Sequence, residues 1–147
     1  MYGPIRTVLF AATLVVLSAA SRAEVDLELS AGIHRVRAEV ANTMGTRAQG
    51  LMHRTSLPAN GGMLFVFDRA AEHCMWMRNT PIPLSVAFLD ESGRILNVEE
   101  MQPHTDASHC AAKPAKFALE MNAGWFSSRG LAAGAALSGI EKAPSPR

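Results

Sequence analysis

Two prolines, Pro81 and Pro83, interrupt the strand-like stretch between residues 73 and 90 and limit how it can fold. Proline lacks the backbone N–H that a strand donates to its neighbour, so pairing must stop at these positions. Residues 73–80 before the prolines and residues 84–89 after them both have strand character. We therefore expect a central strand over 73–80, a pause, and a second strand that opens a hairpin.

The turn of that hairpin is residues 90–93, where Gly93 tolerates a left-handed conformation, and residues 94–98 return as its second strand. Period-two alternation predicts other strands, and helical spacing after the N-cap signal Asn42-Thr43 predicts one short helix over residues 43–53. A helical turn that ends at Gly130 is expected over residues 124–130. The further strands are expected at residues 25–29, 34–40, 63–67, 116–122 and, weakly, 131–140.

The first 23 residues have the pattern of a secretory signal peptide. Arg6 precedes an apolar run from residue 7 to 20, and Ser21-Arg22-Ala23 is a small-x-small cleavage site. The alternative is a retained membrane anchor, but the run is shorter than the ~20 residues that span a bilayer. We expect a mature, exported protein, periplasmic in location, that begins near Glu24, with one domain over residues 24–140 and a flexible tail over 141–147.

Loss of the signal peptide would change the formal charge from +1 to −1, because it removes Arg6 and Arg22 and no acid. Nucleic-acid binding requires a basic patch that replaces phosphate counterions, so no nucleic-acid partner is expected. No later segment is long and apolar enough to span a membrane.

The chain has two cysteines, Cys74 and Cys110, and both lie in the part expected to be exported. In an oxidising compartment an even pair is most simply a disulfide. A loop of this length would stabilise the fold by roughly 3–4 kcal/mol in the chain-entropy model. The alternative is a free thiol pair that serves in redox chemistry or metal binding, which the absence of CxxC spacing disfavours.

A set of short motifs extends along nearly the whole mature chain, from about Val25 to Leu137. The motifs are Arg47…Gly50-Leu51-Met52-x-Arg54, Gly62-Met63-Leu64-Phe65-x-Phe67, Trp76-Met77-x-Asn79-Thr80-x-Ile82-x-Leu84, Phe88, Gly93, Pro103, Leu119-Glu120-x-Asn122-x-Gly124, Gly130 and Gly134. In these residues the chain resembles the family called domain of unknown function 192 (DUF192).

The resemblance implies a compact β-sandwich or barrel with one helix. This agrees with the patterns above, which predict a mainly β single domain with one short helix and a C-terminal helical turn. It implies no biochemical activity. The chain departs from the family at two carboxylate positions, where it has Ser85 and Gly134-Ala135. A role that depends on those carboxylates is therefore not expected here.

One candidate site consists of soft metal ligands. His73, Met75 and Met77 alternate along one predicted strand face, and thioether with imidazole suits copper(I). His104 and His109 would add ligands if the fold brings them near. The alternative, which we favour, is that the methionines fill irregular gaps in the core.

A second candidate site is polar and consists of Arg54, Arg78, Asn79, Thr80 and Glu120, which lie within or beside apolar strands. Buried charges are costly unless they are paired. These residues either pair with one another, with Arg54 or Arg78 holding Glu120, or line a small pocket for a polar ligand.

No known catalytic motif is present, so the leading hypothesis is a non-catalytic exported module that binds a copper-like metal ion or a small polar ligand. One alternative is a hydrolase-like envelope enzyme that uses Glu120 or His104 with Arg54. Another is a structural or accessory partner of envelope proteins, with Trp125 and Phe126 as exposed contacts.

Overall fold

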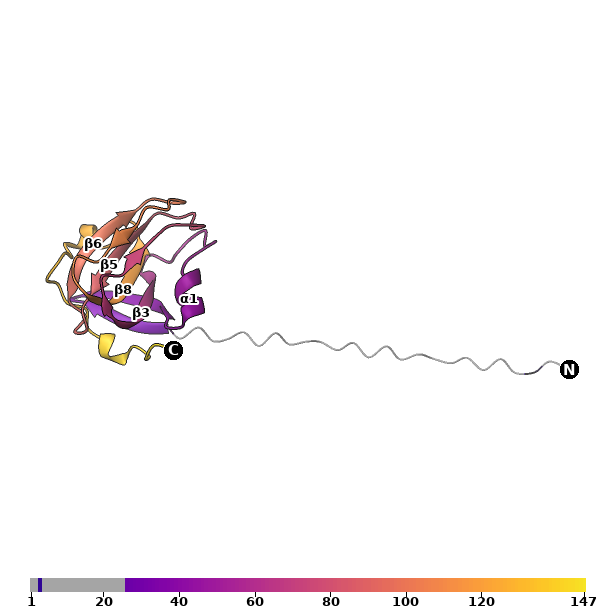
Figure 1. Cartoon of the computed structure of the whole chain (residues 1–147), viewed down its shortest axis with the longest axis horizontal. Helices are drawn as coiled ribbons and strands as arrows, with labels where there is room; N and C mark the ends of the chain where they lie inside the picture. The colour runs from indigo at the N-terminus through magenta and orange to yellow at the C-terminus, as the bar shows by residue number, and fades with distance from the viewer. Residues whose placement is uncertain (1–2, 4–25) are drawn as a thin grey trace.

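The computed structural model describes Gly3 and residues 26–147. Residues 26–147 form a curved six-stranded β-sheet, a separate two-stranded sheet and a short helix (Figure 1). The predicted signal peptide and its cleavage site lie outside the described residues. Among the described residues, no helix has the length and hydrophobicity needed to cross a membrane.

The elements are β1 (Asp26–Ala31), β2 (His34–Ala41), α1 (Met44–Gln49), β3 (Gly61–Ala71), β4 (Cys74–Met75), β5 (Leu84–Leu89), β6 (Ile95–Met101), β7 (His109–Cys110), β8 (Ala115–Asn122) and the 3-10 turns η1 (Ser127–Arg129) and η2 (Ile140–Lys142).

The main sheet has six strands in the order β1-β2-β3-β8-β5-β6. β2 pairs with β3 in parallel, and the other neighbours are antiparallel. The sheet is not a closed barrel, because β1 and β6 remain as edges. The mainly β single-domain fold with one short helix is thus confirmed.

Residues 134–138 lie against both edges of the main sheet, beside β1 and beside β6. Ser138 and Ser30 exchange two backbone hydrogen bonds beside β1, and Ile95 donates to Ala135 at 2.7 Å beside β6. Only isolated bridges form, so the strand expected over 131–140 is wrong. The segment instead shields two sheet edges that would otherwise expose unpaired backbone groups.

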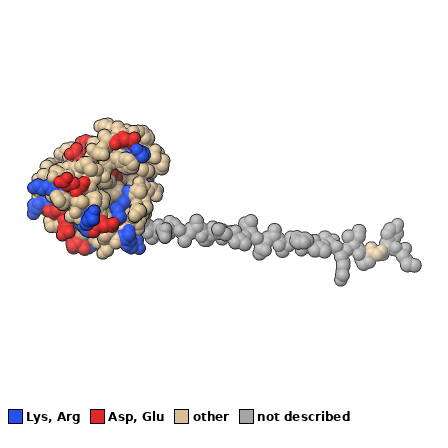
Figure 2. Space-filling model, in the orientation of Figure 1, with Lys and Arg blue, Asp and Glu red and all other residues tan. Residues whose placement is uncertain are grey.

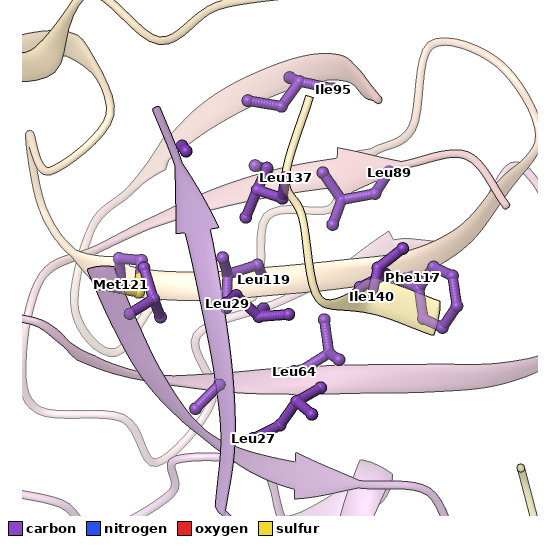
Figure 3. Close-up of a cluster of buried hydrophobic side chains, with 14 of the residues drawn as sticks. Leu27, Leu29, Leu64, Leu89, Ile95, Phe117, Leu119, Met121, Leu137 and Ile140 are labelled. Carbon is purple, nitrogen blue, oxygen red and sulfur yellow. The ribbon is translucent and has the colours of Figure 1, made fainter. Parts of the chain in front are cut away.

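The sheet is buried on both faces. Figure 3 shows the inner cluster, to which β1, β3 and β8 contribute Leu29, Leu64 and Leu119 and the C-terminal segment contributes Leu137 and Ile140. The outer cluster lies under α1 and the β4–β7 sheet. Its buried residues are Ala41, Leu51, Met63, Phe65, Phe67, Met77, Leu84, Val86, Phe88, Met101, Ala111, Ala115 and Ala118.

The strand expected over residues 73–80 is wrong in extent and in place. Only Cys74–Met75 forms a ladder, and it pairs with β7 in a separate two-stranded sheet. The backbone then leaves strand geometry, because Met77 donates to the carbonyl of Thr105 and Asn79 has a φ of 54°. The centre of the main sheet is formed by β3 and β8.

The predicted disulfide is confirmed. Cys74 lies directly opposite Cys110 in the β4–β7 ladder, and their sulfur atoms are 2.03 Å apart. The β5–β6 hairpin is also confirmed, and Gly93 adopts the expected positive φ, at 84°.

Helix α1 is shorter than the range expected for it. Thr43 is the N-cap, and its hydroxyl accepts from the backbone N–H of Thr46 at 3.1 Å. Gly50, with a φ of 48°, ends the helix before Leu51, although apolar spacing continues past that point. The expected turn near Gly130 is present as η1.

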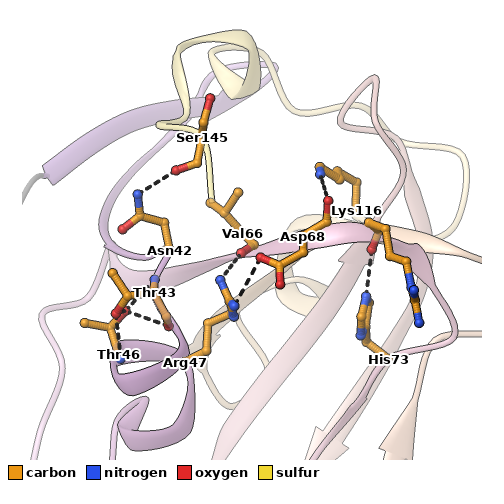
Figure 4. Close-up of polar contacts among 10 residues, drawn as sticks. Asn42, Thr43, Thr46, Arg47, Val66, Asp68, His73, Lys116 and Ser145 are labelled. Carbon is orange, nitrogen blue, oxygen red and sulfur yellow. Dashed lines mark hydrogen bonds and ion pairs between the residues drawn. The ribbon is translucent and has the colours of Figure 1, made fainter. Parts of the chain in front are cut away.

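The segment expected to be a flexible tail, residues 141–147, lies beside the start of α1. The side-chain amide of Asn42 donates to the carbonyl of Ser145 at 2.8 Å, as Figure 4 shows. The backbone N–H of Arg147 donates back to the carbonyl of Asn42 at 2.6 Å. These bonds connect the end of the chain to the β2–α1 junction.

Candidate functional site

Glu120 is a carboxylate in the middle of the main sheet. Strand β8 carries it between Met63 of β3 and Val86 of β5, on the outer face of the sheet. Only 3% of the residue is exposed, and its side chain has no hydrogen-bond or ion-pair partner among the described residues. Its carboxyl oxygens are not wholly enclosed, since they keep a small exposed area toward the pocket. Burial raises the pKa of Glu120 from its ordinary 4.5 to about 8, because a charged carboxylate is poorly solvated there.

A pocket of about 30 Å³ contains Glu120 in its lining. The helix α1 and the turn after it form one wall, and the segment between β4 and β5 forms the opposite wall. The volume is that of roughly one water molecule. The lining residues are Arg47, Ala48, Gln49, Gly50, Leu51, Met52, Phe65, Met75, Trp76, Arg78, Thr80 and Glu120.

Arg47 is fixed on the α1 side of the pocket. One guanidinium nitrogen donates to the carbonyl of Val66 at 3.0 Å, and the other contacts Asp68 at 3.2 Å (Figure 4). Its side chain is only 16% exposed, so much of its stem is buried. The charge of Arg47 is therefore offset by Asp68.

Trp76 and Arg78 line the opposite wall. Trp76 is 45% exposed, and the guanidinium carbon of Arg78 lies 4.0 Å from the centre of its ring. The Nε of Arg78 donates to Asp106 at 3.0 Å. Thr80 is buried nearby, and its hydroxyl donates to the carbonyl of Arg78. This wall thus places an accessible aromatic ring beside a neutralised cation.

Three of the predicted polar residues, Arg78, Thr80 and Glu120, line the same pocket. Asn79 is exposed in a left-handed turn, and its carbonyl accepts from His53. Arg54 does not hold Glu120: its guanidinium nitrogen donates to Glu39 of β2 at 2.9 Å. Arg78 does not hold it either, since Arg78 bonds Asp106.

The predicted metal ligands are spread over different environments. His73 stacks on Phe67 with ring centres 3.8 Å apart, and Met77 is completely buried in the outer cluster. His104 is exposed, whereas His109 lies opposite Met75 in the β4–β7 ladder, 3.9 Å from Glu99. Within the described part of the chain, no group of three or more His, Cys, Asp or Glu side chains could hold a metal ion.

Arg47, Gly50 and Phe65 are site residues that sequence reasoning did not select. All belong to the motifs quoted for the family resemblance, and their proximity to Glu120 depends on how α1 folds over β3 and β8. Trp125 and Phe126 were expected to be exposed contacts, and this is wrong. They are 3% and 0% exposed, because both enter the inner cluster.

A second, larger pocket of about 410 Å³ lies over β1, β2 and the start of β3. Its charged lining residues include Asp26 and Arg37, which form an ion pair at 2.7 Å. Charged residues that alternate with apolar ones along the first two strands were its only signal in the sequence. Unlike the pocket at Glu120, it has no nearly buried carboxyl among its described lining residues.

A family model described as an uncharacterised ACR, DUF192, matches residues 25–139. The chain belongs to the DUF192 family. No curated protein matches the chain.

Two solved structures resemble this DUF192 protein. A candidate transcription regulator from Sinorhizobium meliloti 1021 is 32% identical, with a TM-score of 0.71, and the match covers 78% of this chain and 92% of that one. A protein of unknown function from Novosphingobium aromaticivorans is 31% identical, with a TM-score of 0.73, and the match covers 92% of this chain and 99% of that one.

This DUF192 chain has Ser85 at a position where a carboxylate was expected from the family resemblance. The Ser85 hydroxyl is 2.7 Å from the carboxylate of Glu100 on the neighbouring strand, and it accepts from the backbone N–H of Gly124 at 2.8 Å. Ser85 is completely buried. Glu100 of β6 thus supplies a carboxylate beside Ser85. Its hydrogen bonds connect β5 to the turn after β8.

Proposed function

We propose that this protein is an exported, non-catalytic binding module whose ligand inserts a small polar group into the pocket at Glu120. The observation that carries the proposal is a carboxyl group, almost fully buried, with no polar partner among the described residues and an opening beside it. Buried polar groups in native proteins are normally hydrogen-bonded. A ligand group would supply the missing partner.

A purely structural role explains Glu120 less well. Burial of a carboxyl without a hydrogen bond destabilises a fold, and an apolar side chain in the same place would avoid that loss. The residues on either side in the sheet, Met63 and Val86, are apolar and fill the same layer. We infer that Glu120 is retained for binding and not for folding.

The geometry favours binding over hydrolysis. Among the residues that the structure describes, neither Arg54 nor His104 lines the pocket, and no serine or cysteine side chain does. Glu120 is a candidate base for activating water, but the two guanidinium groups that would stabilise developing charge are already bound to Asp68 and Asp106. A regulator of transcription is also disfavoured here, since Lys and Arg are interspersed with Asp and Glu on the face shown in Figure 2 and the expected mature charge is negative.

The test is a binding screen on the oxidised protein, residues 24–147, by two-dimensional amide NMR. Methylamine, acetamide and ethanol serve as small polar probes. We expect shifts centred on residues 47–52 and 75–80, and their loss in Glu120→Gln. Glu28→Gln is the matched control, because Glu28 lines the larger pocket. Shifts confined to the larger pocket, or no shifts with any probe, would overturn the proposal.

Export is tested separately. We expect the protein recovered from the periplasm to have a mass and N-terminal sequence that begin near Glu24. Recovery of the full-length chain from the membrane fraction would instead support the retained anchor.

A further inference from the structure

We propose that the group bound at Glu120 is a primary ammonium on a narrow aliphatic stem, as in an alkylamine or a lysine side chain. The inference rests on the proposed function and names the ligand chemistry of the same pocket. Three observations support it: the acceptors around the pocket, the size of the pocket and the exposed ring of Trp76.

The pocket offers acceptors and few available donors. The C-terminal end of α1 lines it, and the last carbonyls of a helix lack intrahelical donors and carry partial negative charge. Gly50 donates to Thr46 and Met52 donates to Gln49, which leaves the carbonyls of Arg47 and Ala48 without a backbone donor among the described residues. Arg47 and Ala48 belong to the pocket lining, so we infer that their carbonyl oxygens and the Glu120 carboxylate suit a ligand group that only donates, as an ammonium does.

The two guanidinium groups in the lining do not reverse this preference. Arg47 is paired with Asp68, and Arg78 is paired with Asp106. Each cation is therefore neutralised by its own carboxylate. When Glu120 is ionised, it is the one charge of the described lining that has no opposite charge paired with it.

The volume of about 30 Å³ admits a group the size of a water molecule or an ammonium. A guanidinium or a trimethylammonium group is too large for it. The remainder of the ligand must lie outside, where the face of the half-exposed Trp76 ring that Arg78 does not cover can contact an aliphatic stem. An anionic group is disfavoured because it would face Glu120 and the helix carbonyls.

Binding requires a balanced proton exchange. Near pH 7 the raised pKa of about 8 leaves Glu120 mainly protonated. When an ammonium binds, the carboxyl O–H bond breaks, the proton passes to the solvent, and the carboxylate forms an ion pair with the ligand. The charged groups facing Glu120 are Arg47 from α1 and Arg78 from the segment after β4; its neighbours on β3 and β5, Met63 and Val86, are uncharged.

Proton release makes the affinity depend on pH. Below the pKa of Glu120 the proton competes with the ligand, so we expect affinity for the ammonium to rise about tenfold per pH unit. The rise should level off near pH 8, above which Glu120 is already ionised.

The experiment is isothermal titration calorimetry of the oxidised protein with n-butylamine in phosphate and in MOPS at pH 7, neither of which is a primary amine. The two buffers differ in ionisation enthalpy, so their comparison counts released protons. We expect close to one proton per ligand and about tenfold weaker binding at pH 6. n-Butanol, n-butylguanidine and tetramethylammonium should bind at least tenfold more weakly. A second arm replaces butylamine with a lysine-containing peptide, which separates a protein-borne source from a free amine.

Glu120→Gln should reduce amine affinity at least tenfold and abolish proton release, with an unchanged NMR fold fingerprint. Trp76→Ala is the second variant: it should weaken binding of the stem several-fold and still release a proton. If butanol or acetamide binds in the pocket and butylamine does not, the ammonium assignment is wrong and the binding function stands. If potassium or calcium ions release the proton and amines do not, the assignment is also wrong. If no probe binds, both proposals fail.

Discussion

Cys74 and Cys110 face each other across the β4–β7 ladder, and the bond between them closes a loop of sequence separation 36. Met75, Trp76 and Arg78 follow directly and form a wall of the Glu120 pocket. The disulfide therefore fastens the start of this pocket wall to the short β4–β7 sheet. Stability and binding should both depend on it.

Replacement of both cysteines, Cys74→Ser with Cys110→Ser, should lower the free energy of unfolding by about 3–4 kcal/mol, because the denatured chain regains loop entropy. Urea unfolding monitored by circular dichroism measures this. Dithiothreitol added to the wild type is the matched comparison and should give a similar midpoint. An unchanged midpoint in both cases would show that the disulfide does not stabilise the domain.

Glu120→Gln should change how stability depends on pH. The pKa of Glu120 is raised in the folded protein, so the folded state retains its proton while the unfolded state releases it. Stability from this group is full below the unfolded pKa of 4.5 and is lost as pH rises through about 8. The slope is about 1.4 kcal/mol per pH unit within that window.

Urea midpoints of the wild type and of Glu120→Gln at pH 4.5, 6, 7 and 9 measure the effect. We expect the variant to be relatively more stable at pH 9 than at pH 4.5. Parallel curves for the two proteins would contradict a raised pKa at Glu120.

Gly62→Ala should destabilise the sheet strongly. A Cβ at this position would lie 2.3 Å from the backbone carbonyl oxygen of Glu120, so β3 and β8 would have to separate. We expect a loss of about 1–3 kcal/mol, as for other overpacked sites.

The matched control is Gly45→Ala in α1, where a Cβ meets nothing within 4 Å. That change should stabilise by about 0.5–1 kcal/mol. Thermal unfolding compares the two, and equal effects would refute the close approach.

Thr43→Ala should lower stability by about 1 kcal/mol, because the N-cap bond to Thr46 is lost. Thr43→Ser retains the hydroxyl and should lose much less. Since α1 lines the pocket, the alanine variant should also weaken amine binding, which calorimetry can follow. Equal stability of the alanine and serine variants would show that the cap contributes little.

Local patterns predicted much of the fold correctly. Alternation of apolar and polar residues predicted the β1–β2 hairpin and β8. The glycine-containing turn predicted the β5–β6 hairpin, and the N-cap signal at Thr43 predicted the start of α1. The strand predicted over residues 73–80 is wrong because alternation indicates which side chains face inward and not which backbone groups pair. Met77 does point inward, yet its backbone bonds the 102–108 loop instead of a strand.

By itself the sequence determined the fold class, the disulfide and Glu120 as a residue of interest, since these depend on residue type and on local spacing. Only the tertiary structure decided which of the charged residues pair with one another. Arg54 bonds Glu39 and Arg78 bonds Asp106, so Glu120 is left without a partner among the described residues. Such pairings join segments that are distant in sequence, and they depend on strand order and on where α1 crosses the sheet, which local patterns do not encode.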